Sequence, residues 1–424
     1  MTAETGQAVN TKRPHVVRRR TLGTLAAVGA WSVLVAGMAP AAVAEGDVRS
    51  RQWYLDVMRA EEMWEVTTGE GIKVAVIDTG VNPSTSSLKG QVLKGLDATG
   101  IGKETEDYKG HGTTMAELIA GTGKGGGLQG LAPGVKIIPM RISNTEFQNE
   151  NPVKAGDAED AIRAAADSDA QIISMSFGSE YSSTEERAAV KYAESKGKLF
   201  FASVGNNAKE GNKKEYPAAY PQVVGVASAD KKGNVADYSR YGGSVDIASP
   251  GSDIPRWCDE KFQSYCDGDG TSAATAIASA SAALLWSAHR DWTANQVLRV
   301  LFDTASRTWK ESERSSYLGN GLIRPGVNIL HGKGDPGDPD INPLTDEKTP
   351  GLSDSSTPSP ASSASSKSPD EAPDGKSGDG DKAAAAGSAD DAGGSSTGLI
   401  IGGVAVVAVL AGVAFAVVRR RRSA

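Results

Sequence analysis

Short apolar runs alternate with amphipathic stretches through the middle of the chain. The apolar runs are typical of buried strands and lie at residues 73–77, 135–142, 172–176, 199–204 and 223–227. Stretches with helical spacing lie between several of them, at residues 113–120, 158–167 and 185–196. Strands that are apolar throughout and alternate with helices predict an α/β fold, a doubly wound parallel sheet with helices on both faces. In such folds a functional site lies at the carboxyl ends of the strands.

A long uncharged run near the start of the chain predicts a secretory signal peptide over residues 1–44. Basic residues between Lys12 and Arg20 precede the uncharged stretch 21–44, which ends in small residues before Glu45. This order of a charged start, an apolar centre and a small-residue exit is typical of a cleaved signal. Because the stretch is also long enough to span a bilayer, an uncleaved anchor helix stays open as the alternative.

A second uncharged run, residues 398–418, predicts a single C-terminal transmembrane helix. Its 21 residues contain neither a charge nor a proline, and a helix of this length crosses about 30 Å of hydrocarbon. Arg419 to Arg422 follow directly, and the positive-inside rule places the basic tail 419–424 in the cytoplasm. The chain between the two uncharged runs is then expected outside the membrane.

One folded domain, residues 53–332, is predicted between the two ends, after a short N-terminal extension over residues 45–52. From residue 333 to 397 the chain is rich in Ser, Pro, Gly, Asp and Ala, with 13 acidic residues against 5 lysines. A segment with so few large apolar side chains buries too little surface to offset the entropy of ordering. We therefore predict a disordered, solvated linker over residues 333–397.

Composition and charge narrow the classes of function. The 424 residues carry a net charge of −7 with a pI near 5.4, which lacks the basic footprint of a protein that binds nucleic acid. Two cysteines and four histidines are too few for a four-ligand zinc site alongside other roles. We therefore expect no nucleic-acid partner, no metal and no cofactor, and look for chemistry carried by side chains alone.

Three short segments place polar residues at the expected strand ends and helix starts. Asp78 ends the first strand in Val-Ile-Asp-Thr-Gly, His111 opens a helix in Gly-His-Gly-Thr, and Ser272 opens another in Gly-Thr-Ser-Ala. A serine hydroxyl becomes a nucleophile when an imidazole accepts its proton, and a carboxylate on the other ring nitrogen fixes the tautomer. A helix N-terminus also offers unpaired N–H groups to an oxyanion. Taken singly these residues are ordinary caps, but together they predict nucleophilic catalysis.

The remaining histidines are poorly placed to act as the base. His15 lies in the expected signal peptide, His331 stands at the end of the domain, and His289 lies roughly 25 Å along the helix from Ser272. A fourth candidate, Asn206, follows the fourth strand in Ser-Val-Gly-Asn. Its amide can donate a hydrogen bond to a tetrahedral oxyanion, although a Gly-Asn pair after a strand is by itself more often a turn.

In order and spacing, the segments that contain Asp78, His111, Asn206 and Ser272 resemble those of the subtilisin-like serine proteases, the subtilases. The resemblance covers essentially the whole domain 53–332 and implies hydrolysis of peptide bonds through an acyl-enzyme on Ser272, with catalytic roles for all four residues. It also implies that two segments bind the substrate, namely Ser176, Phe177 and Gly178, and Ser203, Val204 and Gly205. The chain departs from the family pattern at Ala276, where proline is usual, and at Thr114, where a second histidine is common.

The layout of the chain is similar to that of the mycosins, which are membrane-anchored subtilases associated with type VII secretion. The expected signal peptide, short extension, protease domain, Pro/Ser-rich linker and C-terminal span follow one another in that order. This similarity implies an extracytoplasmic endopeptidase held on the cell membrane by a single span, with a protein or peptide substrate and a link to the type VII secretion machinery. A structural subunit of a secretion complex, whose proteolysis is dispensable, is the alternative that fits the same layout.

The two cysteines, Cys258 and Cys266, lie shortly before Ser272 and on the side expected to be extracytoplasmic. Disulfides form and persist in that compartment, so we expect a bond between them that fixes the segment leading to Ser272. Two free thiols are the alternative.

Overall fold

A central sheet organises the computed structural model, which describes residues 48–142, 157–310 and 312–351. Within these residues the sheet has seven strands in the order β2-β3-β1-β4-β5-β6-β7, and every neighbouring pair is parallel. The strands are β1 (Lys73–Asp78), β2 (Leu96–Asp97), β3 (Lys136–Arg141), β4 (Ile172–Met175), β5 (Leu199–Ser203), β6 (Val224–Ala229) and β7 (Ile247–Pro250). The parallel α/β sheet predicted from the sequence is confirmed, and each of the five expected strands forms.

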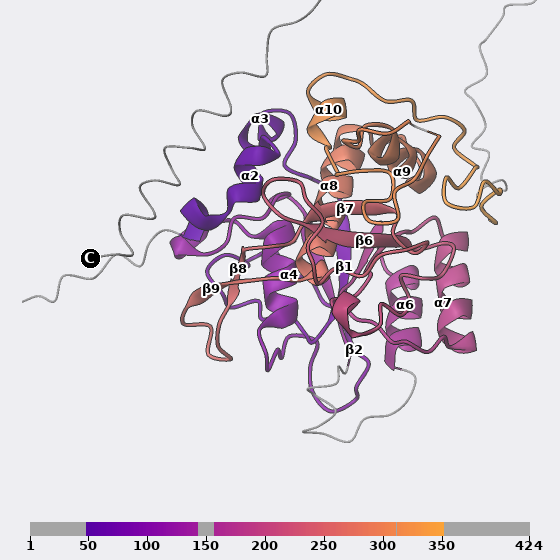
Figure 1. The fold of residues 1–424 in the computed structure, drawn as a ribbon. Helices are drawn as coiled ribbons and strands as arrows, with labels where there is room; N and C mark the ends of the chain where they lie inside the picture. The colour runs from indigo at the N-terminus through magenta and orange to yellow at the C-terminus, as the bar shows by residue number, and fades with distance from the viewer. Residues whose placement is uncertain (1–47, 143–156, 311, 352–424) are drawn as a thin grey trace, which may run out of the picture. The chain divides into compact units, whose positions relative to one another are not determined.

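Helices cover both faces of this sheet, with α6 and α7 on one side and α4 on the other (Figure 1). The described helices are η1 (Val48–Arg51), α2 (Trp53–Val57), α3 (Ala60–Trp64), α4 (His111–Ala120), η2 (Lys124–Gly126), α6 (Asp157–Asp167), α7 (Thr184–Ser195), η3 (Ala208–Glu210), α8 (Thr271–Ala288), α9 (Ala294–Asp303) and α10 (Gly326–Ile329). The three helices expected at residues 113–120, 158–167 and 185–196 are confirmed within two residues.

The central strand β1 has apolar residues at successive positions because both of its faces are buried. Val74 and Val76 belong to the apolar cluster that contains α4 and α8, whereas Ala75 and Ile77 belong to the cluster that contains α6 and α7. Successive strand residues point to opposite faces, and both faces of this strand are covered. Every position from 74 to 78 is therefore buried.

Helix α8 lies within the apolar cluster on one face of the sheet, and its small residues make this possible. It contacts β4, β5, β6 and β7, and all of its residues from Ala273 to Trp286 are buried. The buried hydroxyl groups are satisfied within the helix, because Thr275, Ser279 and Ser281 each donate to the carbonyl four residues earlier. Because α8 is buried along most of its length, its first turn, which contains Ser272, is held at the edge of the sheet.

An antiparallel hairpin that the apolar pattern did not predict leads into α8. Its strands are β8 (Ile254–Trp257) and β9 (Tyr265–Gly268), which pair from Ile254 with Gly268 to Trp257 with Tyr265. The hairpin also contacts α4, where the backbone N–H of Trp257 donates to the hydroxyl of Thr114 at 3.2 Å. Thr114, which occupies the position of the family's second histidine, therefore joins α4 to the hairpin.

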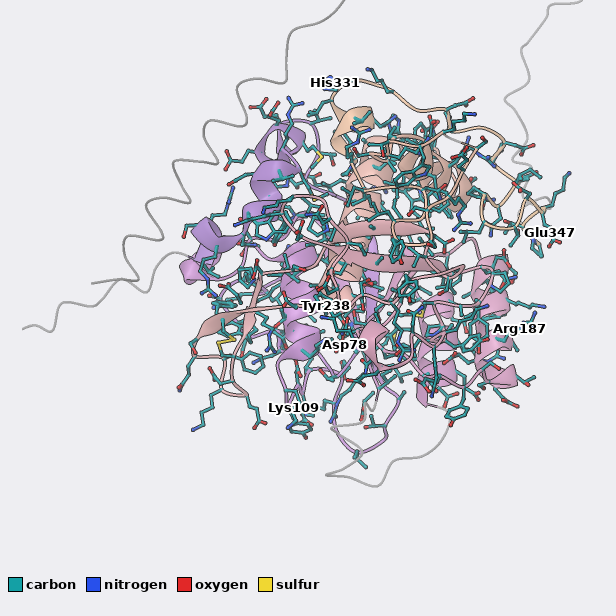
Figure 2. All side chains as sticks on the ribbon, viewed as in Figure 1. Asp78, Lys109, Arg187, Tyr238, His331 and Glu347 are labelled. Carbon is teal, nitrogen blue, oxygen red and sulfur yellow. A yellow bond between two sulfur atoms is a disulfide. The ribbon has the colours of Figure 1, made fainter. Side chains whose placement is uncertain are left out.

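The predicted start of the linker at residue 333 is wrong, because residues 333–351 pack on the domain. The side chains of Asn342 and Thr349 are buried. Asn342 donates to the carboxylate of Glu194 in α7 at 2.9 Å, and Asn295 in α9 donates to Thr349 at 3.0 Å. Glu347, labelled in Figure 2, belongs to this segment. The segment is anchored by hydrogen bonds more than by apolar burial, and for this reason its composition indicated a solvated chain.

The expected signal peptide, the rest of the linker and the expected span at residues 398–418 lie outside the described residues. Among the residues that are described, no helix has the length and apolar character needed to cross a membrane.

Candidate active site

The carboxyl end of β1 and the first residue of α4 bring Asp78 and His111 together. Oδ1 of Asp78 lies 2.7 Å from Nδ1 of His111. The Asp78 side chain is 2% exposed, whereas the imidazole is 37% exposed, so the carboxylate lies behind the ring. Figure 2 labels Asp78 near the middle of the view. Because Nδ1 is held by the carboxylate, Nε2 is the ring nitrogen left for proton transfer.

Ser272 lies in the first turn of α8 and lines the same cavity as His111. The cavity has a volume of about 230 Å³ and is also lined by Asn206 and by the hairpin residues Ile254, Arg256 and Gly268. His111, Asn206 and Ser272, which were predicted from separate segments, therefore line one hollow, and Asp78 contacts His111 at its edge. The N-terminus of an 18-residue helix adds the positive end of its dipole to this place.

The orientation of Asn206 is set by its contacts with Thr271. Its Oδ1 accepts hydrogen bonds from the backbone N–H and from the hydroxyl of Thr271, both at 2.9 Å. Since a backbone N–H can only donate, the other end of the amide must be the NH₂ group. A Cβ atom on Gly270 would lie 3.8 Å from that nitrogen, which places the donor beside the residue that precedes Thr271 and Ser272.

A second carboxylate, Asp107, lies at the start of α4, the helix that begins with His111, and it was not singled out in the sequence. Its Oδ1 accepts from the N–H of Gly110 and from the hydroxyl of Thr79, and its Oδ2 accepts from the N–H and hydroxyl of Thr113. Burial raises the pKa of Asp107 above its ordinary value. These bonds cap the first turn of α4 and join it to the residue that follows Asp78. An aspartate four residues before a helix start was the signal available in the sequence.

The two segments expected to bind substrate follow neighbouring strands. Ser176, Phe177 and Gly178 come directly after β4, while Ser203 ends β5 and is followed by Val204 and Gly205. Because β4 and β5 pair in parallel, the segments lie at the same edge of the sheet as Asp78. The N–H of Gly205 also donates to the hydroxyl of Thr271 at 3.3 Å, which joins this edge to α8.

The two remaining described histidines have other partners. His289 caps the C-terminus of α8, stacks on Trp292 with ring centroids 3.8 Å apart, and its Nε2 lies 2.7 Å from the amide oxygen of Asn328. His331 lies 3.4 Å from a guanidinium nitrogen of Arg59. Among the described residues, no group of three or more His, Cys, Asp and Glu side chains is placed to hold a metal ion.

Cys258 and Cys266 lie side by side at the base of the hairpin loop. Their Cα atoms are 5.4 Å apart, a separation within the range that a disulfide needs. The N–H of Cys258 donates to the carbonyl of Ser264 at 3.0 Å. The same hairpin supplies residues of the cavity, so the pair lies where a covalent link would fix the cavity wall.

A buried acid in α4 was also missed by the sequence. Glu117 is fully buried, and its Oε2 accepts a hydrogen bond from the hydroxyl of Tyr265 in β9 at 2.8 Å. Burial raises the pKa of Glu117 to about 7. The apolar surroundings disfavour the charged carboxylate, and the hydrogen bond to the hairpin does not offset that cost.

The free energy of unfolding should therefore depend on Glu117 between about pH 4.5 and 7. In this range the folded domain retains the proton that the unfolded chain, with an ordinary pKa of 4.5, has released. The unfolded state binds fewer protons, so the contribution of Glu117 to stability falls as the pH rises. Glu117→Gln should remove this fall and exceed the wild type at pH 8 by up to about 3 kcal/mol. Urea unfolding at pH 5, 6, 7 and 8 measures the difference.

The matched control for this prediction is Glu61→Gln, which removes an exposed carboxylate from α3. Its stability should run parallel to that of the wild type over the same pH range. If Glu117→Gln also runs parallel to the wild type, the assigned burial effect is wrong.

Comparisons with known proteins agree with this geometry. The sequence profile of the subtilase family, Peptidase S8, matches residues 69–321. Thermitase from Thermoactinomyces vulgaris is 33% identical over 275 residues, which cover 65% of this chain and 94% of that protein. The major intracellular serine protease of Bacillus subtilis strain 168 is 33% identical over 250 residues, which cover 56% of this chain and 76% of that protein.

Solved structures extend the comparison. MycP1 from Mycobacterium smegmatis superposes with a TM-score of 0.57 at 26% identity, covering 68% of this chain and 86% of that one. MycP3 protease from the type VII (ESX-3) secretion system gives 0.56 at 27% identity, covering 66% and 88%. Fervidolysin from Fervidobacterium pennivorans, a keratinolytic enzyme related to subtilisin, gives 0.59 at 26% identity, covering 68% and 47%.

Proposed function

The chain belongs to the subtilase family of serine proteases, and from this premise we propose that it is an endopeptidase that hydrolyses peptide bonds through an acyl-enzyme on Ser272. The observation that carries the proposal is the 2.7 Å contact between Asp78 and His111 beside the cavity that Ser272 lines. A carboxylate, an imidazole and a serine hydroxyl in this order are the parts that acyl transfer requires.

The proposed reaction starts when Oγ of Ser272 attacks the carbonyl carbon of the scissile bond and Nε2 of His111 accepts the hydroxyl proton. Asp78 holds the imidazole through Nδ1 and stabilises the cation that forms. The oxyanion of the tetrahedral intermediate receives hydrogen bonds from Nδ2 of Asn206 and from the N–H of Ser272 at the start of α8. His111 then gives the proton to the leaving amine, and a water molecule, activated by the same imidazole, hydrolyses the acyl-enzyme.

The substrate backbone is proposed to run along the segment Ser176 to Gly178. The side chain of the residue before the scissile bond then lies between this segment and the segment Ser203 to Gly205. Both segments lie at the ends of paired strands. The exposed Gly178 has no side chain to keep a peptide backbone away from the sheet edge.

A fluorophosphonate probe tests the proposal because it reacts with activated serines. The full-length protein in detergent should be labelled on one residue, and peptide mass spectrometry should place the adduct on Ser272. Protein unfolded in urea should not be labelled, since the activation depends on the neighbours of the serine. Absence of labelling on folded protein, or an adduct on another serine, would contradict the proposed role of Ser272.

The place of action proposed for this protease is the outer side of the cell membrane. The supporting features are runs in the sequence, namely the uncharged stretches predicted to be a signal peptide over residues 1–44 and a span over residues 398–418, and the basic tail over residues 419–424. Because the segment 333–351 packs on the domain, only the residues between it and residue 398 are left for the proposed linker. The likeness to MycP1 and MycP3 supports a link to type VII secretion, since MycP1 is an essential component of the type VII (ESX-1) secretion system and MycP3 is a protease of the ESX-3 system.

A disulfide between Cys258 and Cys266 is part of the same proposal. Their 5.4 Å Cα separation suits the bond, and the extracytoplasmic compartment would maintain it. The chain-entropy model gives about 2–2.5 kcal/mol for closing so short a loop. Its role would be to hold β8 and β9 against α4 beside the nucleophile.

A second candidate function is that of a structural subunit whose proteolysis is dispensable. It is supported by the same description of MycP1 as an essential component of the type VII (ESX-1) secretion system. A protein can be essential to a secretion system without its hydrolytic activity being essential. The two functions differ in what an inactive Ser272 variant does in the native host.

A further inference from the structure

Glu215 lies at the edge of the sheet where the substrate side chain is proposed to bind, although no pattern in the sequence singles it out. The next residue, Tyr216, forms a two-hydrogen-bond bridge with Ser179, with N–O distances of 2.8 and 2.9 Å. This bridge holds Glu215 beside Gly178. A Cβ atom on Gly205 would lie 2.6 to 2.7 Å from both carboxylate oxygens, and a Cβ atom on Gly178 would overlap Oε2.

The carboxylate of Glu215 therefore lies against both glycines that bound the proposed pocket. Real Cβ atoms do not approach within 3.0 Å of other atoms, so a side chain at Gly178 or Gly205 would displace the carboxylate. Gly205 also has a φ of +100°, which L-amino acids with side chains rarely adopt. The absence of side chains at the two glycines thus gives the carboxylate of Glu215 its space between the segments that follow β4 and β5.

Glu215 shares its cationic partner, Arg240, with a second carboxylate. Nη2 of Arg240 lies 3.0 Å from Oε1 of Glu215 and 3.2 Å from Oε1 of Glu180, so one guanidinium serves two carboxylates. The Arg240 side chain is 5% exposed, and its backbone N–H donates to the carbonyl of Gly205 at 3.0 Å. Lys213 binds Glu180 at 2.6 Å. The buried guanidinium of Arg240 is thus shared between the carboxylates of Glu215 and Glu180.

The Glu215 side chain is 16% exposed, so it is partly accessible to solvent. Burial raises the pKa of Glu215, and the nearby Arg240 opposes that rise. A partly buried carboxylate that shares its cationic partner with another acid is stabilised when a ligand brings a second cation to it. An acidic side chain in the same place would face two like charges, and an aromatic one would cover the carboxylate without a hydrogen bond.

We propose that Glu215 makes the protease selective for lysine or arginine immediately before the scissile bond. The inference rests on the proposed function, because it uses the proposed substrate-binding segments and the same reaction. The cationic side chain enters between Gly178 and Gly205 and binds the carboxylate of Glu215, while Arg240 keeps its bond to Glu180. Selectivity of this kind is a difference in kcat/KM between peptides that differ at one residue.

The test uses the full-length protein in detergent and five internally quenched peptides that differ only in the residue before the scissile bond: Arg, Lys, Ala, Phe and Glu. We expect kcat/KM for Arg and Lys to exceed that for Ala and Phe by about ten- to a hundred-fold, the range of one charge-assisted hydrogen bond. The Glu peptide should be the poorest. In Glu215→Gln the ratio of kcat/KM for Arg over Ala should fall by about the same factor.

The matched control is Glu210→Gln, which removes an exposed carboxylate of η3 from the same connection between β5 and β6. The ratio for Arg over Ala should keep its wild-type value there, since Glu210 does not face the glycines. The wild-type series is itself decisive if Glu215→Gln does not fold. Cleavage that favours Ala or Phe, with Ser272 still labelled by the fluorophosphonate, overturns the role of Glu215 and leaves the proposed function standing. If no peptide is cleaved and Ser272 is not labelled, the proposed function fails and this inference fails with it.

Discussion

Ser272→Ala is expected to lower kcat for peptide hydrolysis by about 10⁶-fold with little change in stability, because it removes the oxygen that forms the acyl-enzyme. Asn206 and the N-terminus of α8 remain in the variant, so a small residual acceleration over water should persist. The substitution lies in the first turn of a helix that already contains many alanines, and alanine is the best helix former. Hydrolysis of an internally quenched peptide and a thermal melt measure the two effects.

Ser281→Ala is the matched control for this prediction. Its hydroxyl lies in the same helix and donates to the carbonyl of Ile277, but it lies away from the cavity. The control should retain wild-type kcat and lose at most about 1 kcal/mol of stability with its hydrogen bond. Residual activity of Ser272→Ala above one percent, which active-site titration shows not to be trace wild-type enzyme, would exclude Ser272 as the nucleophile.

The same variant separates the two candidate functions in the native host. If hydrolysis is the function, Ser272→Ala should reproduce the secretion defect of a deletion strain. If the protein acts as a structural subunit, Ser272→Ala should secrete normally while the deletion does not. Immunoblots of the variant must show wild-type abundance, because loss of the folded protein would mimic a deletion.

The sequence predicted the residues whose positions depend on strand ends and helix starts. Asp78 ends β1, His111 starts α4 and Ser272 lies in the first turn of α8, and each of these boundaries has a local signal in the apolar pattern. Parallel strands end at one edge of the sheet, so local boundaries were enough to bring distant residues together. Asn206 was accessible for the same reason, since it follows β5.

The buried acids could not be predicted in the same way. Glu215 comes from a polar connection without periodicity, and only the bridge between Ser179 and Tyr216 places it beside two glycines. Glu117 has the spacing of an ordinary helix residue, and its burial depends on the hairpin β8–β9. That hairpin was missed because its short strands pair with each other rather than with the sheet. Burial that depends on contacts between distant segments leaves no pattern in the local sequence.

The second large effect is expected for Asp78→Asn, which should lower kcat by about 10⁴-fold while KM changes little. The carboxylate is 2% exposed and lies 2.7 Å from Nδ1 of His111, and the N–H of Thr79 also donates to Oδ1 at 2.7 Å. An asparagine of the same shape fills this space, so the fold should be kept. A neutral amide does not stabilise the imidazolium that forms when His111 takes the proton of Ser272, and its NH₂ end favours the wrong tautomer. Steady-state kinetics on one peptide measures the loss.

Two further measurements decide whether Asp78 acts through His111. The rate at which a fluorophosphonate labels Ser272 should fall in Asp78→Asn, because the probe reports the activation of the serine and does not reach the buried carboxylate. The double variant Asp78→Asn with Ser272→Ala should be no slower than Ser272→Ala alone, since residues that act as one unit are not additive. An Asp78→Asn protein that is labelled at the wild-type rate would show that the carboxylate only supports the fold. The loss of kcat would then belong to misplacement of β1 and α4, and the proposed proton transfer would have to be assigned without Asp78.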